Sequence, residues 1–408
     1  MPSLKFSEVF KPGTYPEHTY VERTSKDSMF SYEQRLNMAL GLDGFLVCIT
    51  GPSKTGKTVL CEKVIGLDNI VSLNGNDFEK SGDFWGAIAL KAGIPLSGTQ
   101  GTTNTVNLPA ESIMQSATQN YVVNKDAVVK YFVDNEKVLV LDDFHYASDD
   151  MQYEAACQLK DVIRRNFKAV VISLPHRSDD PLRQNPDLNG RIQFIELQPW
   201  TDEELIQIPQ KGFQKLNVVA SPEILSQMTL ESAASPQLMQ YICFNLSLAA
   251  NQKSINTVTH ELLQLSCRIT TVNLDCKAIV DYIKFGPPSR GQKRVKYQLT
   301  NGKSVDIYEL LLYIIAENPP YTKLPLEEIK KRSDALIVGI SEAPHIRKES
   351  SLSKPNSTKL KDALGKTQER LKQEKAFYNV IECKDNALYV LESLFLFYLR
   401  WSNWKERD

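Results

Sequence analysis

The sequence lacks any stretch near the ~20 consecutive apolar residues that a membrane helix needs, and its first residues lack the apolar core of a signal peptide. Its seven cysteines are scattered singly, and none forms a C-x-x-C pair. Scattered cysteines in a chain of this length are typical of reduced, mostly buried side chains. These absences predict a cytoplasmic protein that does not enter a membrane.

Several catalytic and metal-binding signatures are also missing. The chain has no H-E-x-x-H pair and no nucleophile elbow. His145 and His176 have no companions at metal-ligand spacing, which argues against a zinc site. No internal repeat suited to target sensing is present, and no segment resembles a nuclease, a protease or a TIR-like effector.

Charge is balanced overall, with 48 basic and 49 acidic side chains, but it is unevenly distributed. Residues 281–408 carry 23 Lys and Arg against 17 Asp and Glu, so the rest of the chain is acidic. An anionic partner is therefore expected to meet the C-terminal third. A solvated basic surface explains the same count equally well.

The segment GPSKTGKT fits the pattern G-x-x-x-x-G-K-[ST]. It follows an apolar run at 45–50 that is typical of a buried strand, and it precedes a helical pattern at 57–67. In this context the glycines let the backbone turn around phosphates, and the amides of residues 53–58 form an anion nest at a helix N-terminus. The predicted nucleotide-binding residues of this loop are Gly51, Pro52, Ser53, Lys54, Thr55, Gly56, Lys57, Thr58 and Val59.

A triphosphate with magnesium requires further groups around this loop. We expect Lys57 to contact the β- and γ-phosphates and the Thr58 hydroxyl to bind Mg²⁺. A second motif, four apolar residues at 138–141 followed by Asp142 and Asp143, supplies carboxylates at the end of a strand. Asp142 is expected to orient a magnesium-bound water, and Asp143 to polarise the attacking water. The predicted cofactors are ATP and Mg²⁺.

With these two motifs the chain resembles the AAA+/STAND group of P-loop ATPases, especially archaeal-type ATPases and origin-initiator ATPases. The resemblance covers most of the chain in order. It implies an adenine contact from Tyr20 and Val21, upstream of the phosphate loop, and another from Pro236, in a G-x-P-like segment. These families begin a lid helix at that proline.

The resemblance also implies groups that sense the γ-phosphate. Ser173 or Arg177, at the end of a strand pattern at 168–177, takes the sensor position, and Arg191 takes the position of the family's box VII arginine. The alternative interpretation of both arginines is a surface position without such a role. The family's glycine is Ala234 here. No sensor-2 arginine precedes the proline, which favours a STAND-like switch over a motor-like AAA+ protein. Aspartate replaces the usual glutamate at 143, which implies slow hydrolysis.

The expected fold is an α/β P-loop NTPase core with a parallel sheet, followed by an α-helical lid and a C-terminal winged-helix domain. Helices are expected at 201–216, 221–229, 235–249, 255–271 and 274–284, then at 304–320, 324–335 and 357–377 before a hairpin at 378–393. The expected divisions are an N-terminal arm and helix at 1–43, the core at 44–200, the lid at 201–284, a basic linker at 285–300 and the winged helix at 301–408. Polar segments at 93–112 and 339–357 are expected to be loops.

Three functions fit this organisation. The first is an ATP-dependent switch that controls assembly with like subunits or a separate effector protein, in prokaryotic anti-phage defence or stress signalling. The second is a DNA-binding initiator or transposition-type ATPase whose winged helix grips duplex DNA. The third is a nucleotide-stabilised scaffold that does not hydrolyse ATP.

Overall fold

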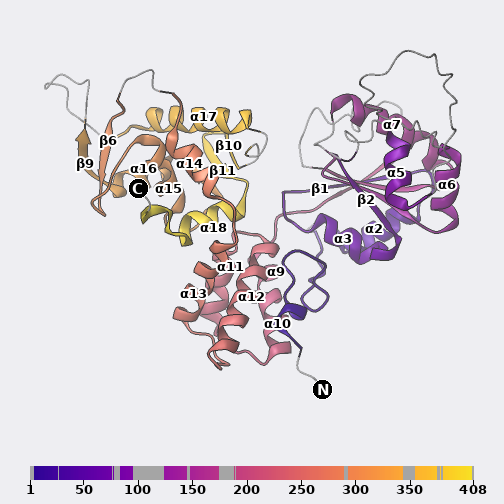
Figure 1. Cartoon of the computed structure of the whole chain (residues 1–408), viewed down its shortest axis with the longest axis horizontal. Helices are drawn as coiled ribbons and strands as arrows, with labels where there is room; N and C mark the ends of the chain where they lie inside the picture. Colours follow the sequence, from indigo (N-terminus) through magenta and orange to yellow (C-terminus); the bar gives the residue numbers. More distant parts are fainter. Residues whose placement is uncertain are drawn as a thin grey trace, which may run out of the picture. The chain divides into compact units, whose positions relative to one another are not determined.

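The computed structural model describes residues 4–25, 27–75, 77, 83–94, 124–144, 148–173, 188, 190–288, 293–342, 354–374, 377 and 380–406. The chain forms two compact units (Figure 1). The sheet unit is Glu22–Gln198, and the composite unit joins Met1–Val21 to Pro199–Asp408. The predicted arm and helix at 1–43 is thus shared between the two units.

The sheet unit contains a five-stranded sheet in the order β2-β3-β4-β1-β5, in which every pair is parallel. Its strands are β1 (Leu46–Thr50), β2 (Ile70–Asn74), β3 (Val138–Asp142), β4 (Lys168–Ser173) and β5 (Ile192–Glu196). The three central strands are those that the sequence predicts as near-continuous apolar runs. Such runs are typical of strands that are covered on both faces.

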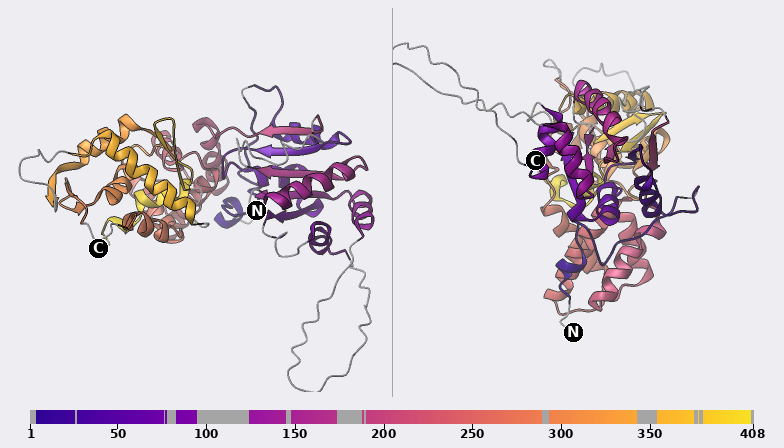
Figure 2. Two further views of the ribbon diagram at one scale, coloured as in Figure 1. Left: turned by 90° about the horizontal axis from the view of Figure 1, so that it is seen from above. Right: turned by 90° about the vertical axis from the view of Figure 1, so that its right-hand side faces the viewer.

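Helices cover both faces of this sheet (Figures 1 and 2). One face carries Val47 and Ile49 and packs on α2 and α3, while the other carries Leu139 and Leu141 and packs on α5, α6 and α7. The helical elements of this unit are α2 (Tyr32–Gly41), α3 (Lys57–Ile65), η1 (Leu67–Asn69), α5 (Phe84–Ala92), α6 (Lys125–Asp134) and α7 (Asp149–Ile163). The α/β prediction is therefore confirmed.

The first part of the composite unit is helical, as predicted. It comprises α1 (Phe6–Val9), α9 (Asp202–Leu205), α10 (Gln207–Leu216), α11 (Pro222–Glu231), α12 (Pro236–Gln252), α13 (His260–Val272) and α14 (Lys277–Phe285). Thr201 and Glu204 form a capping box, and Ser221 caps α11 with Pro222 at its first position. The predicted helix at 255–271 begins later, because Val219 and Thr257 form a bridge that keeps the preceding chain extended.

The second part of the composite unit combines helices with two small sheets, in the orders β10-β11-β8 and β7-β6-β9. Its elements are β6 (Lys296–Leu299), β7 (Ser304–Val305), α15 (Ile307–Ala316), β8 (Lys323–Pro325), α16 (Leu326–Leu336), β9 (Ile337–Glu342), α17 (Ser357–Gln373), β10 (Ile381–Lys384), β11 (Ala387–Val390), α18 (Ser393–Trp401) and η5 (Asn403–Glu406). The predicted hairpin is confirmed. Asp385 and Asn386 form its turn with φ of 50° and 55°, as a two-residue hairpin turn of type I′ requires. The winged-helix assignment stays a prediction.

Parts of two segments predicted as a linker and a loop form strands of one small sheet instead. Lys296–Leu299, predicted as linker, forms β6, and the start of the predicted loop at 339–357 lies in β9, which pairs with it. The two segments are some forty residues apart, so neither shows its partner in its own sequence pattern. The remainder of that loop and most of the segment at 93–112 lie outside the described residues.

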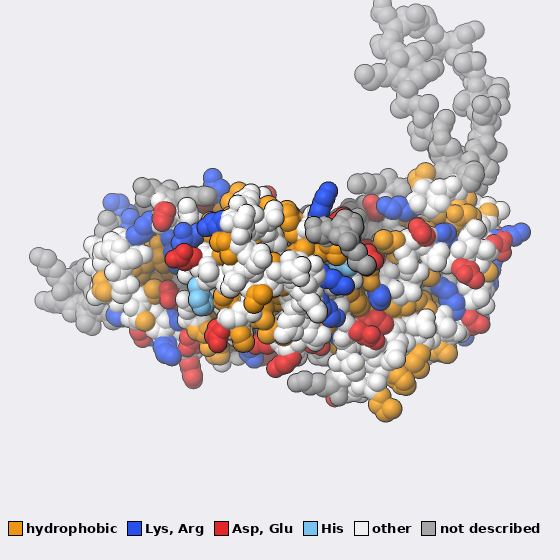
Figure 3. Space-filling view, turned by 90° about the horizontal axis from the view of Figure 1, so that it is seen from below, with side chains coloured by type: hydrophobic (Ala, Val, Ile, Leu, Met, Phe, Trp, Pro, Cys, Tyr) orange, Lys and Arg blue, Asp and Glu red, His pale blue; other side chains and the backbone are white. Residues whose placement is uncertain are grey.

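No helix in the described part of the chain combines the length and apolar character needed to cross a membrane. On the face that Figure 3 shows, the described basic and acidic side chains are interspersed.

Candidate nucleotide-binding site

The phosphate-loop motif joins the end of β1 to the start of α3, at the carboxyl edge of the sheet. A Cβ atom at Gly51 would lie 2.8 Å from the Leu197 carbonyl oxygen, so only glycine fits where the loop passes this backbone. Gly56, the residue before α3, has φ of 93°, which glycine adopts without strain. Inside the loop the Thr55 hydroxyl donates to the Pro52 carbonyl at 2.9 Å. The local backbone geometry therefore explains why glycine occupies both of these motif positions.

The first turn of α3 has no side-chain cap among the described residues. Gly56 offers no side chain to cap the helix, so the amides of the first turn have no side-chain acceptor there. Amides without a side-chain cap and the positive end of the helix dipole together favour a phosphate. The helix start thus has the geometry that the motif predicts.

Lys57 lies within the loop that it is expected to serve. Its Nζ donates to the carbonyl oxygens of Gly51 at 3.0 Å and Pro52 at 2.8 Å. Burial lowers the pKa of the Lys57 ammonium, and the carboxylates of Asp143 and Asp142 act in the opposite direction. The lysine is therefore a partly desolvated cation close to both acidic residues of the second motif.

The two predicted magnesium ligands are in direct contact. The Thr58 hydroxyl donates to Asp142 Oδ2 at 2.6 Å, although the residues are 84 positions apart in the sequence. A hydroxyl and a carboxylate oxygen are hard donors that suit Mg²⁺, which commonly completes its shell with water and nucleotide phosphates. Within the described residues no group of three or more His, Cys, Asp or Glu could hold a metal alone. These residues fit a cation that arrives with a nucleotide.

Asp143 follows directly, in an unusual backbone conformation. Its φ is 47°, and its amide donates to Asp142 Oδ1 at 2.9 Å. Burial raises the pKa of the Asp143 carboxyl; the Asp142 charge adds to this, and Lys57 opposes it. A carboxylate with a raised pKa beside the two predicted magnesium ligands is suited to accept a proton from water.

Glu62 is a neighbour of this site that the motifs do not identify. It lies one helical turn after Thr58 on α3, and burial, with the Asp142 charge, raises the pKa of its carboxyl. Its Oε2 is buried and has no hydrogen-bond partner among the described residues. The spacing of four residues from Thr58 is the signal that could have identified it, because such positions share a helix face.

The structure locates two of the three predicted γ-phosphate sensors, Ser173 and Arg191. Ser173 ends β4, is buried, and lies opposite Thr50, the last residue before the phosphate loop. Arg177 lies outside the described residues. Arg191 precedes β5, and its carbonyl accepts from the amide of Leu46 at the start of β1. Arg191 is thus at the amino edge of the sheet, one strand length of roughly 15 Å from the edge that carries the loop.

The residues that the resemblance assigns to adenine all belong to the composite unit. The Tyr20 carbonyl accepts from Lys211 Nζ at 2.7 Å, and the Val21 side chain is buried. Pro236 begins α12 directly after Ser235, which caps that helix. Ala234, in place of the family glycine, has φ of 59°. This left-handed conformation favours glycine, yet alanine occupies the position.

No family model matches the sequence, and no curated protein matches it. Several solved structures are similar. Cdc6p from Pyrobaculum aerophilum is 17% identical, with 96% of each chain covered and a TM-score of 0.44. A Walker-type ATPase of Pyrococcus abyssi is 10% identical, with 93% of this chain and 98% of that chain covered and a TM-score of 0.48. The RuvB Holliday junction branch migration motor of Thermotoga maritima is 12% identical, with 88% and 90% covered and a TM-score of 0.39.

The fold of the sheet unit rests on its own topology. A parallel sheet, a glycine loop between β1 and α3, and an acidic residue at the end of β3 in contact with the loop threonine occur together. Residues 22–198 therefore have an α/β P-loop fold.

Proposed function

We propose that this protein binds ATP with Mg²⁺ at the phosphate loop. The contact between Thr58 and Asp142 carries the proposal, because it brings the two expected magnesium ligands together at the start of α3. Magnesium, when bound, would neutralise phosphate charge, while Lys57 and the first-turn amides of α3 orient the phosphates.

Calorimetry with ATP and magnesium tests binding directly. Replacement Lys57→Ala removes a charge-assisted contact and should weaken binding by about 10- to 100-fold. The matched control is Lys63→Ala, on the exposed side of the same helix. Failure of the parent chain to bind any adenine nucleotide would refute the proposal.

We further propose slow hydrolysis with Asp143 as the group that polarises water. Its raised pKa supports a role as proton acceptor, while its side chain is one methylene shorter than glutamate. Asp143→Asn should lower turnover by about 10²- to 10⁴-fold while nucleotide binding is retained. A parent chain that binds ATP but shows no turnover above this variant supports the non-hydrolysing scaffold instead.

The biological role that we propose is a STAND/AAA+ type switch that controls assembly or a separate effector, in anti-phage defence or stress signalling. Size-exclusion chromatography with light scattering, with and without ATP, tests assembly. A pull-down under ATP with mass spectrometry tests for an effector, and Lys57→Ala is the control for both. Identical profiles and partners in all conditions would contradict a switch.

Assembly has a specific test in Arg191. Because Arg191 lies at the sheet edge opposite to its own phosphate loop, any contact with a γ-phosphate requires a second copy. Arg191→Ala and Lys57→Ala should each lower turnover alone, and a mixture of the two should recover part of it. Recovery requires that an intact arginine of one chain completes the intact phosphate loop of another.

DNA binding is the second candidate function. The observation that favours it is the exposed side of α17, which carries Lys361, Lys366 and Lys372. Asp362 and Glu369 share that side, and Arg370 donates instead to the Tyr282 carbonyl. A mobility-shift series over salt concentration decides the matter, because phosphate contacts make affinity fall steeply with salt. Absence of binding at low salt would exclude duplex DNA as a partner.

A further inference from the structure

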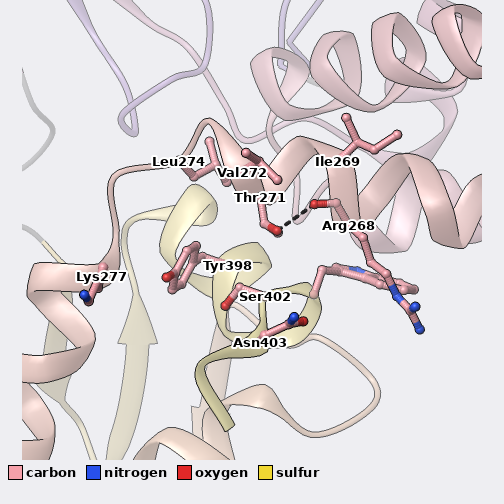
Figure 4. A pocket seen from close by; sticks show the side chains of 10 residues that line it. Arg268, Ile269, Thr271, Val272, Leu274, Lys277, Tyr398, Ser402 and Asn403 are labelled. Atoms are coloured by element: carbon pink, nitrogen blue, oxygen red, sulfur yellow. Dashed lines mark hydrogen bonds between the residues drawn. The ribbon is translucent and has the colours of Figure 1, made fainter. Parts of the chain in front are cut away.

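A groove of about 530 Å³ lies within the composite unit, between the α13–α14 turn and the end of α18 (Figure 4). Volumes of roughly 300–1,000 Å³ are typical of small-molecule sites. None of its described lining residues belongs to the phosphate loop or to the second motif. The candidate nucleotide-binding site therefore does not account for this groove.

The groove is basic. Arg268 and Lys277 stand at its two ends, and none of its described lining residues is acidic. Within the described part of the chain neither cation forms an ion pair. Lys277 is also the first residue of α14, whose N-cap residue, Cys276, gives the helix no side-chain cap among the described residues. The positive end of that helix therefore adds to the charge of the lysine.

Hydrogen-bonding groups lie between these two cations. Ser402 Oγ is buried and has no partner among the described residues. The Tyr398 and Asn403 side chains flank it in the groove. Buried hydroxyls normally have partners, so the unpaired Ser402 hydroxyl beside a basic groove lacks an acceptor, which a bound anion would supply after rotation about the serine χ1.

Part of the lining is apolar. Val272 is 81% exposed, and Leu274 and Trp401 line the same groove. A bare inorganic anion would leave these side chains in water. An apolar body attached to the anion would cover them.

We propose that this groove binds a small organic phosphate, a ring or short aliphatic body that carries a phosphate group. The anionic group accepts from Ser402 in the field of Lys277 and Arg268, and the apolar body covers Val272 and Leu274. A bound molecule would connect the α13–α14 turn to the end of α18, and would thereby join the two parts of the composite unit. This site does not depend on nucleotide binding at Lys57.

Calorimetry on the full-length chain in a Lys57→Ala background tests the proposal, because the phosphate loop is then disabled. The probes are 1-naphthyl phosphate, 1-naphthol and inorganic phosphate. We expect the phosphate ester to bind at least tenfold more tightly than either of the other two. Equal binding of naphthol would mean an apolar surface only, equal binding of phosphate would mean an unspecific basic surface, and either result would overturn the proposal.

Variants locate the binding. Lys277→Gln with Arg268→Gln should weaken binding of the ester at least tenfold, and Ser402→Ala several-fold. The control pair Lys253→Gln with Lys296→Gln removes two exposed lysines elsewhere and should change nothing. Unchanged affinity in the first pair, or no binding of the ester at millimolar concentration, refutes the proposal. So does binding of an Asp- and Leu-rich peptide without binding of the ester, because that result indicates a protein partner.

Discussion

Removal of either side chain of the Glu231–Arg400 pair is expected to destabilise the composite unit strongly. Glu231 ends α11, and its carboxylate accepts two hydrogen bonds from the Arg400 guanidinium on α18, at 2.7 and 3.0 Å. The Trp401 indole donates to the same carboxylate at 2.8 Å. The two charged side chains are only 6% and 7% exposed.

The magnitude follows from this burial. Loss of one partner from a buried pair costs about 3–5 kcal/mol, because the other charge stays buried without compensation. We expect Glu231→Ala to fall near the lower end, about 3 kcal/mol. Arg400 would still donate to the Ala316 carbonyl and to Asn318 Oδ1. Removal of both side chains leaves no buried charge without a partner. The loss of unfolding free energy in the double variant should therefore be about 2 kcal/mol smaller than the sum of the two single losses.

Urea unfolding of the full-length chain measures these free energies in the parent, Glu231→Ala, Arg400→Ala and the double variant. Tryptophan fluorescence is a suitable signal, since Trp200, Trp401 and Trp404 all belong to the composite unit. The matched control is the exposed pair Arg165–Asp126, 43% and 72% exposed, whose coupling should be about 0.5 kcal/mol or less. Additivity of the Glu231 and Arg400 effects to within about 0.5 kcal/mol would refute the reasoning.

Further outcomes can be measured on single variants. Ala234→Gly should raise the free energy of unfolding by about 1 kcal/mol, because glycine adopts φ of 59° without the strain of a side chain; an unchanged urea midpoint would contradict this. Gly212→Ala should destabilise by about 1–3 kcal/mol and speed proteolysis near residues 4–21, since the new Cβ would overlap the Phe10 ring; equal digestion rates would count against it. Glu62→Gln should stabilise the protein at neutral pH, because a carboxyl whose pKa is raised on folding loses stabilisation as pH rises; the gain should vanish below about pH 4.5, and a gain independent of pH would refute the assignment. Asp142→Ala should weaken magnesium-dependent nucleotide binding more than magnesium-free binding, as calorimetry with and without EDTA would show.

Local chemistry in the sequence determined much of the framework. The glycine loop, the apolar runs of β1, β3 and β4, and the capped starts of α9 and α11 are visible in consecutive residues, because each depends on neighbours within a few positions. The same holds for the hairpin at Asp385 and Asn386, where two turn residues separate alternating strands.

Only the tertiary structure decided what depends on distant partners. The pairing of β6 with β9 and the place of Glu62 beside Asp142 join segments that no local pattern connects. The motifs likewise indicate neither the sheet edge at which Arg191 lies nor the groove around Ser402. The physical reason is that burial, charge proximity and strand register each depend on two segments at once. The sequence of one segment does not identify the segment that will lie against it.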